Sequence, residues 1–387
     1  MSHWQVALAL LCAACSSKGS ITEPDNPPDL PGPDCLPPDP SDDFASAYLL
    51  SSLDVANGSI KTDTICPKFD DDYWQVPISG DRQLAVLSLT FTKAVSPIEL
   101  AAQWFGPPAN ALLATVIEPP GQPSHFIGAN LPALTPGNYY LRAYDSAQSP
   151  IEDADTLYEL SVRQKTDLDT HEPNNTRNAA SVLSSGQSVN GYFSYIGDED
   201  WFVITPTTAT SPVVTVDLSW PSDLNTSLAS GGLTWIMEQG TTTHSPNSID
   251  NPILCPVDCS RTSTRLWSVN EPIYIRVLNS TGAIDDDDPY TLTVSINTDG
   301  DELGQRNDTA STAWEITAPA PASTSTLYGP TQHTLVAEND LDWFRIDRPA
   351  GSIDHSLLFL RAQSTSTRFL LRVVFYEITQ WAVREAV

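Results

Sequence analysis

The chain has 387 residues and carries 48 acidic against 19 basic residues, which gives a formal net charge of −29. A surface this acidic excludes a nucleic-acid-binding protein, because contacts with phosphates need a basic face. The length suggests two to four domains, each able to bury its own core. Apart from the N-terminus, no continuous apolar stretch is long enough to cross a bilayer, so we expect no internal membrane span.

Residues 1–15 have the pattern of an export signal. A short apolar stretch runs from Trp4 to Ala14, and the small residues Ala13 and Ala14 precede Cys15. This arrangement resembles a bacterial lipoprotein signal, in which the cysteine becomes the lipidated first residue. It predicts an exported protein held by a lipid at Cys15 on the outer membrane or cell surface. The alternative is a plain secretion signal, which would leave the protein periplasmic or extracellular.

Residues 16–41 are rich in proline and acidic residues and contain almost nothing apolar. We predict a disordered acidic linker that holds the folded domains away from the anchor.

Four cysteines remain beyond the signal, and an even number in an exported chain predicts disulfides. Cys255 and Cys259 are close enough in sequence to close a small loop. By elimination, Cys35 pairs with Cys66. The alternative is a zinc site, which would need histidines near these pairs, and none lies there.

From residue 42 onward the chain repeats itself. We divide it into repeats at 42–165, 166–298 and 299–387, the third being partial or degenerate. Each repeat opens with an acidic or amide-rich turn, continues through an alanine-rich step and reaches an acid–aromatic element. The three elements read Asp70-Asp71-Asp72-Tyr73-Trp74, Asp198-Glu199-Asp200-Trp201-Phe202 and Asp340-Leu341-Asp342-Trp343-Phe344. The first two repeats also share a closing Y-x-L-x-V strand.

Apolar residues alternate with polar ones after each acid–aromatic element, which indicates strands with one buried face. We therefore predict an all-β protein of tandem antiparallel β-sandwiches, jelly-roll-like in kind. The second aromatic of each pair should be buried, namely Trp74, Phe202 and Phe344. The outward aromatics either bind a ligand or are covered by the second sheet or by the neighbouring repeat. These are Tyr73, Tyr140, Trp201, Tyr274 and Trp343.

The motifs resemble the bacterial pre-peptidase C-terminal (PPC) domain family. The residues that carry the resemblance are EPNNT from Glu172, GDEDWF from Gly197, IYIRV from Ile273 and Y-x-L-x-V from Tyr290. It extends less completely to the first repeat and partially to the third. The resemblance implies a small non-catalytic β-sandwich found beside secreted proteases.

The same resemblance implies a calcium site. Carried over residue by residue, its ligands are Glu172, Asn174, Asn175 and Asp198. The first repeat offers Asp42, Asp43 and Asp70, and the third offers Asn307, Asp308 and Asp340, although both lack part of the motif. Calcium prefers several carboxylate and amide oxygens, as such a turn can supply. The alternative is that these acids cap the turn by accepting hydrogen bonds from backbone amides.

Catalytic motifs are absent from the sequence: it contains neither H-E-x-x-H nor G-x-S-x-G. Asp198 and Asp200 resemble a glycosidase pair, but their recurrence in every repeat favours a role in the fold. The acidic run Asp285 to Asp288 is interpreted as a solvated loop, and the alternative is a second cation site. We therefore predict no enzyme, but a secreted or cell-surface lipoprotein with binding or spacer modules. Its partner would be an extracellular protein or polysaccharide. The alternative is an accessory region of a secreted hydrolase system.

Overall fold

The structure is a computed structural model that describes only part of the chain. The described residues are 41–66, 70–91, 98–118, 126–147, 157–207, 212–221, 233–245, 259–279, 284–298, 307, 309–316, 335, 337, 340–346, 374–379 and 382–386. The predicted signal, residues 16–40 of the predicted linker, Cys15, Cys35 and Cys255 lie outside them. The linker prediction is wrong for its last residue, Ser41, which is fully buried. The chain forms two compact units, Met1–Asp299 with Val336–Asn339, and Gly300–Leu335 with Asp340–Val387.

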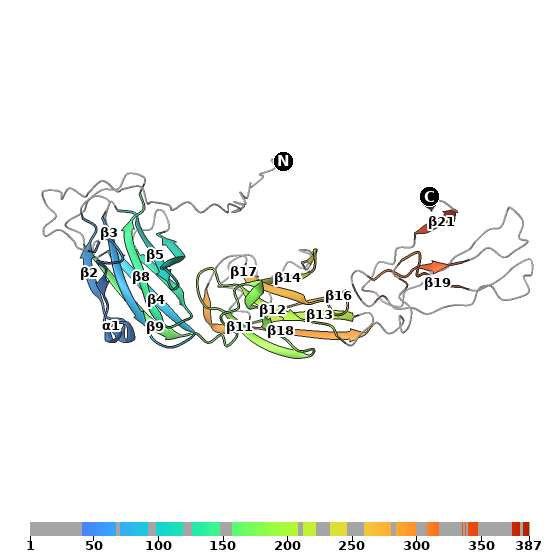
Figure 1. Cartoon of the computed structure of the whole chain (residues 1–387), viewed down its shortest axis with the longest axis horizontal. Coiled ribbons are helices and arrows are strands. Elements are labelled where there is room, and N and C mark those ends of the chain that lie inside the picture. The colour runs from blue at the N-terminus through green and yellow to red at the C-terminus, as the bar shows by residue number, and fades with distance from the viewer. Residues whose placement is uncertain are drawn as a thin grey trace, which may run out of the picture. The chain divides into compact units, whose positions relative to one another are not determined.

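The protein is almost entirely β, as predicted, and its first repeat is a sandwich of two sheets (Figure 1). One sheet has the order β1 (Tyr48–Leu49), β3 (Asp71–Ile78), β8 (Gly137–Asp145), β5 (Leu100–Gly106) and β6 (Ala111–Ile117). The other has the order β2 (Lys61–Thr64), β9 (Leu157–Thr166), β4 (Gln83–Phe91) and β7 (Phe126–Ala133). A short helix, α1 (Ser52–Asn57), follows β1.

The second repeat builds the same two layers. One sheet has the order β10 (Ser181–Val182), β12 (Asp200–Ile204), β17 (Ile273–Asn279), β14 (Leu233–Gln239) and β15 (Thr242–His244). The other has the order β11 (Gln187–Phe193), β18 (Asp285–Thr298), β13 (Pro212–Trp220) and β16 (Cys259–Leu266). A single 3₁₀ turn, η1 (Arg177–Ala179), lies in the alanine-rich step.

The described part of the third repeat contains only short strands. They are β19 (Trp314–Glu315), β20 (Phe344–Arg345), β21 (Phe375–Thr379) and β22 (Ala382–Ala386). Across the described ranges, no helix has both the length and the apolar character needed to cross a membrane.

The alternation of side chains along the strands determines which residues point into the core of each sandwich. In β12 the inward positions are Asp200, Phe202 and Ile204, all buried, while Trp201 and Val203 point outward. Phe202 is 0% exposed and Trp74 is 6% exposed, so the predicted inward aromatic is confirmed in both sandwiches. It is wrong for Phe344, which is 39% exposed: among the described residues, the two-residue strand β20 pairs with the equally short β19, and this pair does not cover the ring.

All three repeats fasten their opening turn to the acid–aromatic strand by one backbone hydrogen bond. The N–H groups of Tyr73, Trp201 and Trp343 donate to the carbonyls of Ser41, Asn174 and Asn307, at 2.9, 3.0 and 2.8 Å. A short strand then begins and pairs in parallel with the acid–aromatic strand. Ser41 is therefore the counterpart of Asn174, which shifts the expected alignment of the first repeat. Asp43 caps its own turn by accepting from the N–H groups of Ala45 and Ser46 at 2.8 and 2.7 Å.

Candidate metal centre

The second sandwich gathers three acidic side chains where its opening turn meets the start of β12. Glu172 comes from the turn, Asp198 from the loop between β11 and β12, and Asp200 from the first position of β12. One carboxylate oxygen of each lies within 4.8 Å of the others. The three side chains belong to residues that are 6%, 8% and 0% exposed. Solvent therefore does little to screen the repulsion between their charges.

Several polar atoms in this cluster lack a hydrogen-bond partner. They include Oδ1 of Asp198, Oδ1 of Asp200, and both Oδ1 and Nδ2 of Asn174. Asn174 is 0% exposed. Its side-chain amide lies beside Asp200 and, against the larger effect of burial, lowers the pKa of that carboxyl. Unpaired buried polar atoms are costly and uncommon in folded proteins, so they indicate a missing group. A cation at this position would satisfy the oxygens.

Glu172 is held in place by its neighbours. Its Oε1 accepts from the Tyr195 hydroxyl at 2.8 Å, and its Oε2 accepts from the Asn174 backbone N–H at 3.0 Å. Asn175 donates from Nδ2 to Glu172 and to the Tyr195 hydroxyl, and its Oδ1 accepts from the Glu199 N–H. Both ends of the Asn175 amide are thus engaged. It orients Glu172, whereas the sequence assigned it as a ligand.

Asp200 is anchored from the opposite sheet. Tyr290 of β18 is fully buried and donates its hydroxyl to Asp200 Oδ2 at 2.6 Å. Gly191 of β11 makes room for this ring, because a Cβ there would lie 2.2 Å from the Tyr290 hydroxyl oxygen. Asp198 is fixed differently: its Oδ2 accepts from the Ser194 N–H at 2.7 Å, which closes the loop between the two strands. Each aspartate is therefore held through Oδ2, and Oδ1 of both aspartates has no hydrogen-bond partner.

Burial raises the pKa of all three acids. The pKa of Glu172 rises to about 7, chiefly through burial. The pKa values of Asp198 and Asp200 lie well above the usual range, again through burial first. The neighbouring charges add to it, Asp200 acting on Asp198 and Asp169 acting on Asp200. Without a cation these groups resist ionising, and a divalent cation would reverse that preference.

The structure brings Glu172, Asn174 and Asp198 together, as the resemblance implied, and adds Asp200. A sequence signal for Asp200 exists. It stands two residues before Phe202, so strand alternation places a carboxylate on the buried face. The recurrence of the pair Asp198 and Asp200 in every repeat had favoured a role in the fold alone.

In the first sandwich Asp70 and Asp72 occupy the equivalent positions and are 1% and 0% exposed. Asp70 Oδ2 accepts from the Cys66 N–H at 2.7 Å, as Asp198 does from Ser194, and Asp72 accepts from the Ser41 hydroxyl. In the third repeat, Asp340 is 7% exposed and Asn307 donates to Asp342 at 3.1 Å. Asp308 lies outside the described residues.

Cys66 is 6% exposed, but its predicted partner is not among the described residues, so the disulfide stays a prediction. The same holds for Cys259, of which the structure describes only the backbone at the start of β16.

The outward aromatics are partly covered by the opening turns. In the first sandwich Phe44 packs on Tyr73 and Tyr140, with ring centroids 4.9 and 5.1 Å apart, and leaves Tyr73 8% exposed. In the second, the Arg177 guanidinium lies 4.2 Å from the Tyr274 ring centre. Tyr73 is therefore buried, and Phe44 of its own opening turn helps to cover it, whereas the expected cover was the second sheet or the neighbouring repeat.

The acidic run at 285–288 is the start of β18 and not a free loop. Asp286 forms an ion pair with Lys165 at 2.5 Å, so the predicted solvated loop is wrong for this residue. Asp287, whose side chain is 82% exposed, does face solvent.

No family model matches the sequence, and no curated protein matches it. Among solved structures, the tandem CBM22-1–CBM22-2 domain of Paenibacillus barcinonensis Xyn10C is 9% identical, covers 62% of this chain and 91% of its own, and has a TM-score of 0.19. The CUB1-EGF-CUB2 domain of human MASP-1/3 is 8% identical, covers 61% of this chain and 99% of its own, and has a TM-score of 0.17. Neither likeness carries a functional assignment.

Proposed function

We propose that this chain is an exported, non-catalytic protein that presents PPC-like β-sandwiches as binding or spacer modules at the cell surface. Its lipid anchor would be Cys15. The second sandwich holds one structural calcium ion through Glu172, Asn174, Asp198 and Asp200. What supports the proposal is the repeated all-β architecture together with a buried acidic cluster.

One observation carries the calcium assignment. Glu172, Asp198 and Asp200 are buried within 4.8 Å of one another, and unpaired oxygens on both aspartates and on Asn174 lie in the same cluster. All donors are hard oxygens, which suit calcium or magnesium and not zinc or copper. Calcium accepts an irregular arrangement of carboxylate and amide oxygens, whereas magnesium demands a near-ideal octahedron. The donor set therefore favours calcium.

Bound calcium would supply positive charge to a cluster that otherwise resists ionisation. Glu172 would bring the opening turn and Asp200 the start of β12, so the ion joins two segments of the sandwich. Asn175 and Tyr195 hold the Glu172 carboxylate in position. Tyr290 does the same for Asp200. The role is structural: the ion stabilises the folded state by its binding free energy.

Calorimetric titration of the ion-free full-length protein tests the site. We expect calcium to bind and to raise the melting temperature of the second sandwich. A calcium concentration about 100 times Kd stabilises the folded state by about 2.7 kcal/mol. Asp198→Asn and Asp200→Asn should each weaken binding strongly. Asp217→Asn is the matched control, because Asp217 is an exposed acid on β13 of the same sandwich. A melting temperature indifferent to calcium would remove the metal from the proposal.

The partner class is an extracellular protein or polysaccharide. Binding of the full-length protein to envelope fractions, fibrous proteins and glycans would identify it, with Trp201→Ala as the surface variant on β12. If no fraction retains the protein, the modules act as spacers and the binding role is excluded.

A further inference from the structure

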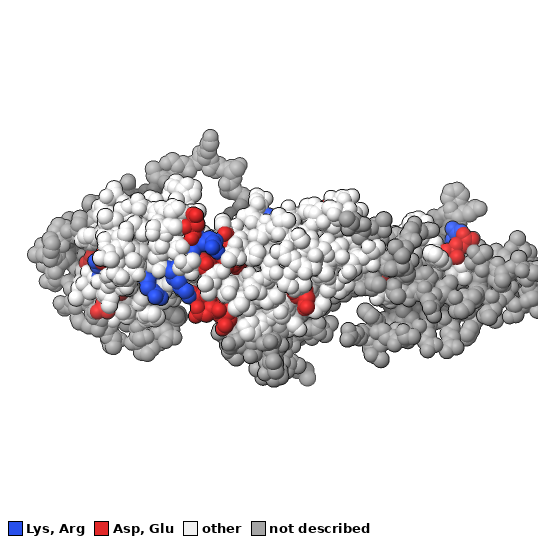
Figure 2. Space-filling view, turned by 90° about the horizontal axis from the view of Figure 1, so that it is seen from below, with Lys and Arg blue, Asp and Glu red and all other residues white. Residues whose placement is uncertain are grey.

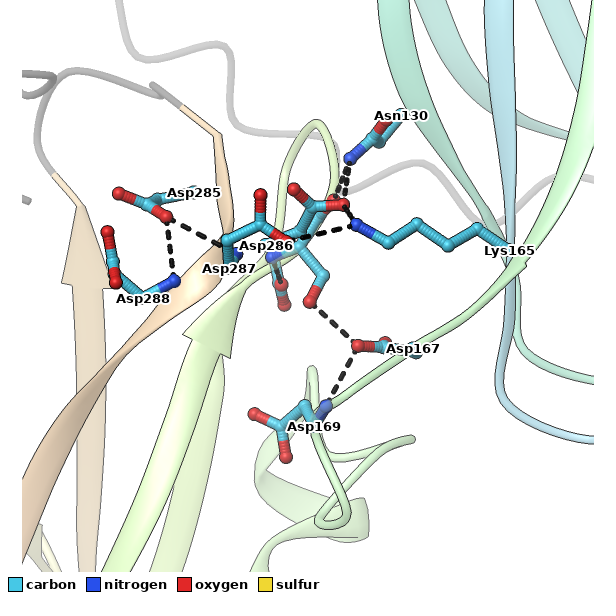
Figure 3. A network of polar contacts seen from close by, with 10 residues as sticks. Asn130, Lys165, Asp167, Asp169, Asp285, Asp286, Asp287 and Asp288 are labelled. Carbon is cyan, nitrogen blue, oxygen red and sulfur yellow. Dashed lines mark hydrogen bonds and ion pairs between the residues drawn. The ribbon is translucent and has the colours of Figure 1, made fainter.

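The first and second sandwiches contact each other through polar side chains at the ends of their strands. Lys165, near the end of β9, donates from Nζ to Oδ2 of Asp286 at 2.5 Å. Asn130 of β7 donates from Nδ2 to the same oxygen at 3.0 Å. Both donors belong to the first sandwich and the acceptor belongs to β18 of the second (Figure 3). One carboxylate therefore gathers two partners from across the joint.

Asn130 also holds the loop between β11 and β12. Its Nδ2 donates to the Ser194 carbonyl at 3.0 Å, and its own carbonyl accepts from the Ile196 N–H at 3.2 Å. The Ile196 side chain packs against the core of the first sandwich. The loop that carries Asp198 is thus docked on the neighbouring sandwich by both hydrogen bonds and apolar contact.

The connecting segment after β9 is bonded on both sides. Asp167 donates from its N–H to the Arg82 carbonyl at 3.0 Å, and Arg82 Nη1 donates to the Asp169 carbonyl at 3.0 Å. The Ser194 hydroxyl donates to Asp167 Oδ1 at 2.7 Å. Asp167 and Asp169 are 1% and 0% exposed. This segment is therefore hydrogen-bonded to both sandwiches through its buried residues, while Leu168 between them is exposed.

Domains joined in one chain move relative to each other by default, unless the interface between them is large and hydrophobic. Here hydrogen bonds, an ion pair and the apolar contact of Ile196 join the two sandwiches. From the three sets of contacts we infer that the first and second sandwiches form one rigid body, locked by Lys165 and Asn130 onto Asp286. The side chains of Lys165 and Asp286 are 30% and 19% exposed, so solvent and salt screen the pair only in part. The space-filling view shows basic and acidic side chains next to each other where the first and second sandwiches meet (Figure 2). The inference deepens the spacer role proposed above, and the lock itself uses no metal ligand.

Distance measurements by pulsed electron spin resonance test the lock in the full-length protein. Spin labels are attached through genetically encoded azide residues at Leu53 and Val182, which are 70% and 80% exposed and lie on different sandwiches. We expect one narrow distance distribution for the unmodified joint. Lys165→Glu should broaden it roughly twofold, because like charges then face each other across the joint.

Two further variants test whether the broadening comes from the ion pair between Lys165 and Asp286. The charge swap Lys165→Glu with Asp286→Lys should restore the narrow distribution. Arg163→Glu changes the charge equally on the exposed face of the same strand, and it should leave the width unchanged. Circular dichroism confirms that every variant is folded.

A broad distribution in the unmodified protein, or a width unaffected by Lys165→Glu, overturns the inference. Calcium titrations on the same samples separate it from the proposed function. If the protein binds calcium but its distance distribution is broad, the rigid-body inference is wrong and the metal site stands. If the distance distribution is narrow but the protein binds no calcium, the metal site is wrong and the rigid-body inference stands.

Discussion

In protein freed of divalent ions, the free energy of unfolding of the second sandwich should fall as the pH rises from weakly acidic to neutral. Glu172 is 6% exposed, and burial raises its pKa from the ordinary value of 4.5 to about 7. A raised carboxyl pKa means that the folded state binds the proton more tightly than the unfolded chain does. The stability from Glu172 is therefore present below its ordinary pKa and is lost as the pH rises toward about 7.

A change in pKa from 4.5 to about 7 corresponds to roughly 3 kcal/mol lost across this pH window. Asp198 and Asp200 have raised pKa values and add to the loss in the same direction. With saturating calcium the trend reverses, because the ion binds the deprotonated carboxylates and stabilises the fold more as protons leave.

The assay is urea unfolding of ion-free protein, followed by tryptophan fluorescence from about pH 5 to about pH 8. Glu172→Gln is the comparison, because it keeps the shape and removes the titration. Asp54 does not disturb this window. The hydrogen bond from Lys61 lowers its pKa to about 2, so its contribution is lost only in stronger acid. An ion-free protein whose stability rises between pH 5 and 7, or one that matches Glu172→Gln throughout, would refute the reasoning.

Three further outcomes are expected. Gly191→Ala should destabilise the second sandwich by about 1–3 kcal/mol and weaken calcium binding, since its Cβ would push Tyr290 away from Asp200; urea unfolding and calorimetry measure both. Phe202→Ala should cost about 3–5 kcal/mol, because the ring is fully buried, and a smaller loss in urea unfolding would contradict its place in the core. Ser51→Ala should cost about 0.5–2 kcal/mol in the first sandwich by removing the capping box of α1, and an unchanged unfolding midpoint would argue against that cap.

The inward aromatics show what the sequence could predict. Trp74 and Phe202 follow from strand alternation alone, because a period of two assigns faces without reference to the rest of the chain. Phe344 has the same local pattern but is 39% exposed. Burial needs a partner layer, and the local pattern does not say whether the chain provides one. Strand order is equally hidden: β3 pairs with β8 and not with β2, a choice made by contacts far apart in sequence.

The candidate metal centre was predictable in its ligand types but not in its details. Motif resemblance assigned Asn175 and omitted Asp200, since a motif gives residue identity and not the direction of a side chain. Asp286 was expected in water, because a run of like charges usually repels itself into solvent. Lys165, which lies more than a hundred residues earlier in the chain, pairs with Asp286 and shields it from solvent. A local sequence pattern cannot reveal such a distant partner.

The fastening of each opening turn bears on how these modules carry mechanical load. Tension applied ahead of Ser41 reaches the first sandwich through the hydrogen bonds of Ser41 with Tyr73 and Asp72 and then through β1, which contributes two residues to its sheet. We expect these bonds to break before those between the long central strands. The first sandwich therefore has a short length of chain to release under a pull from the N-terminal side, while its core stays folded.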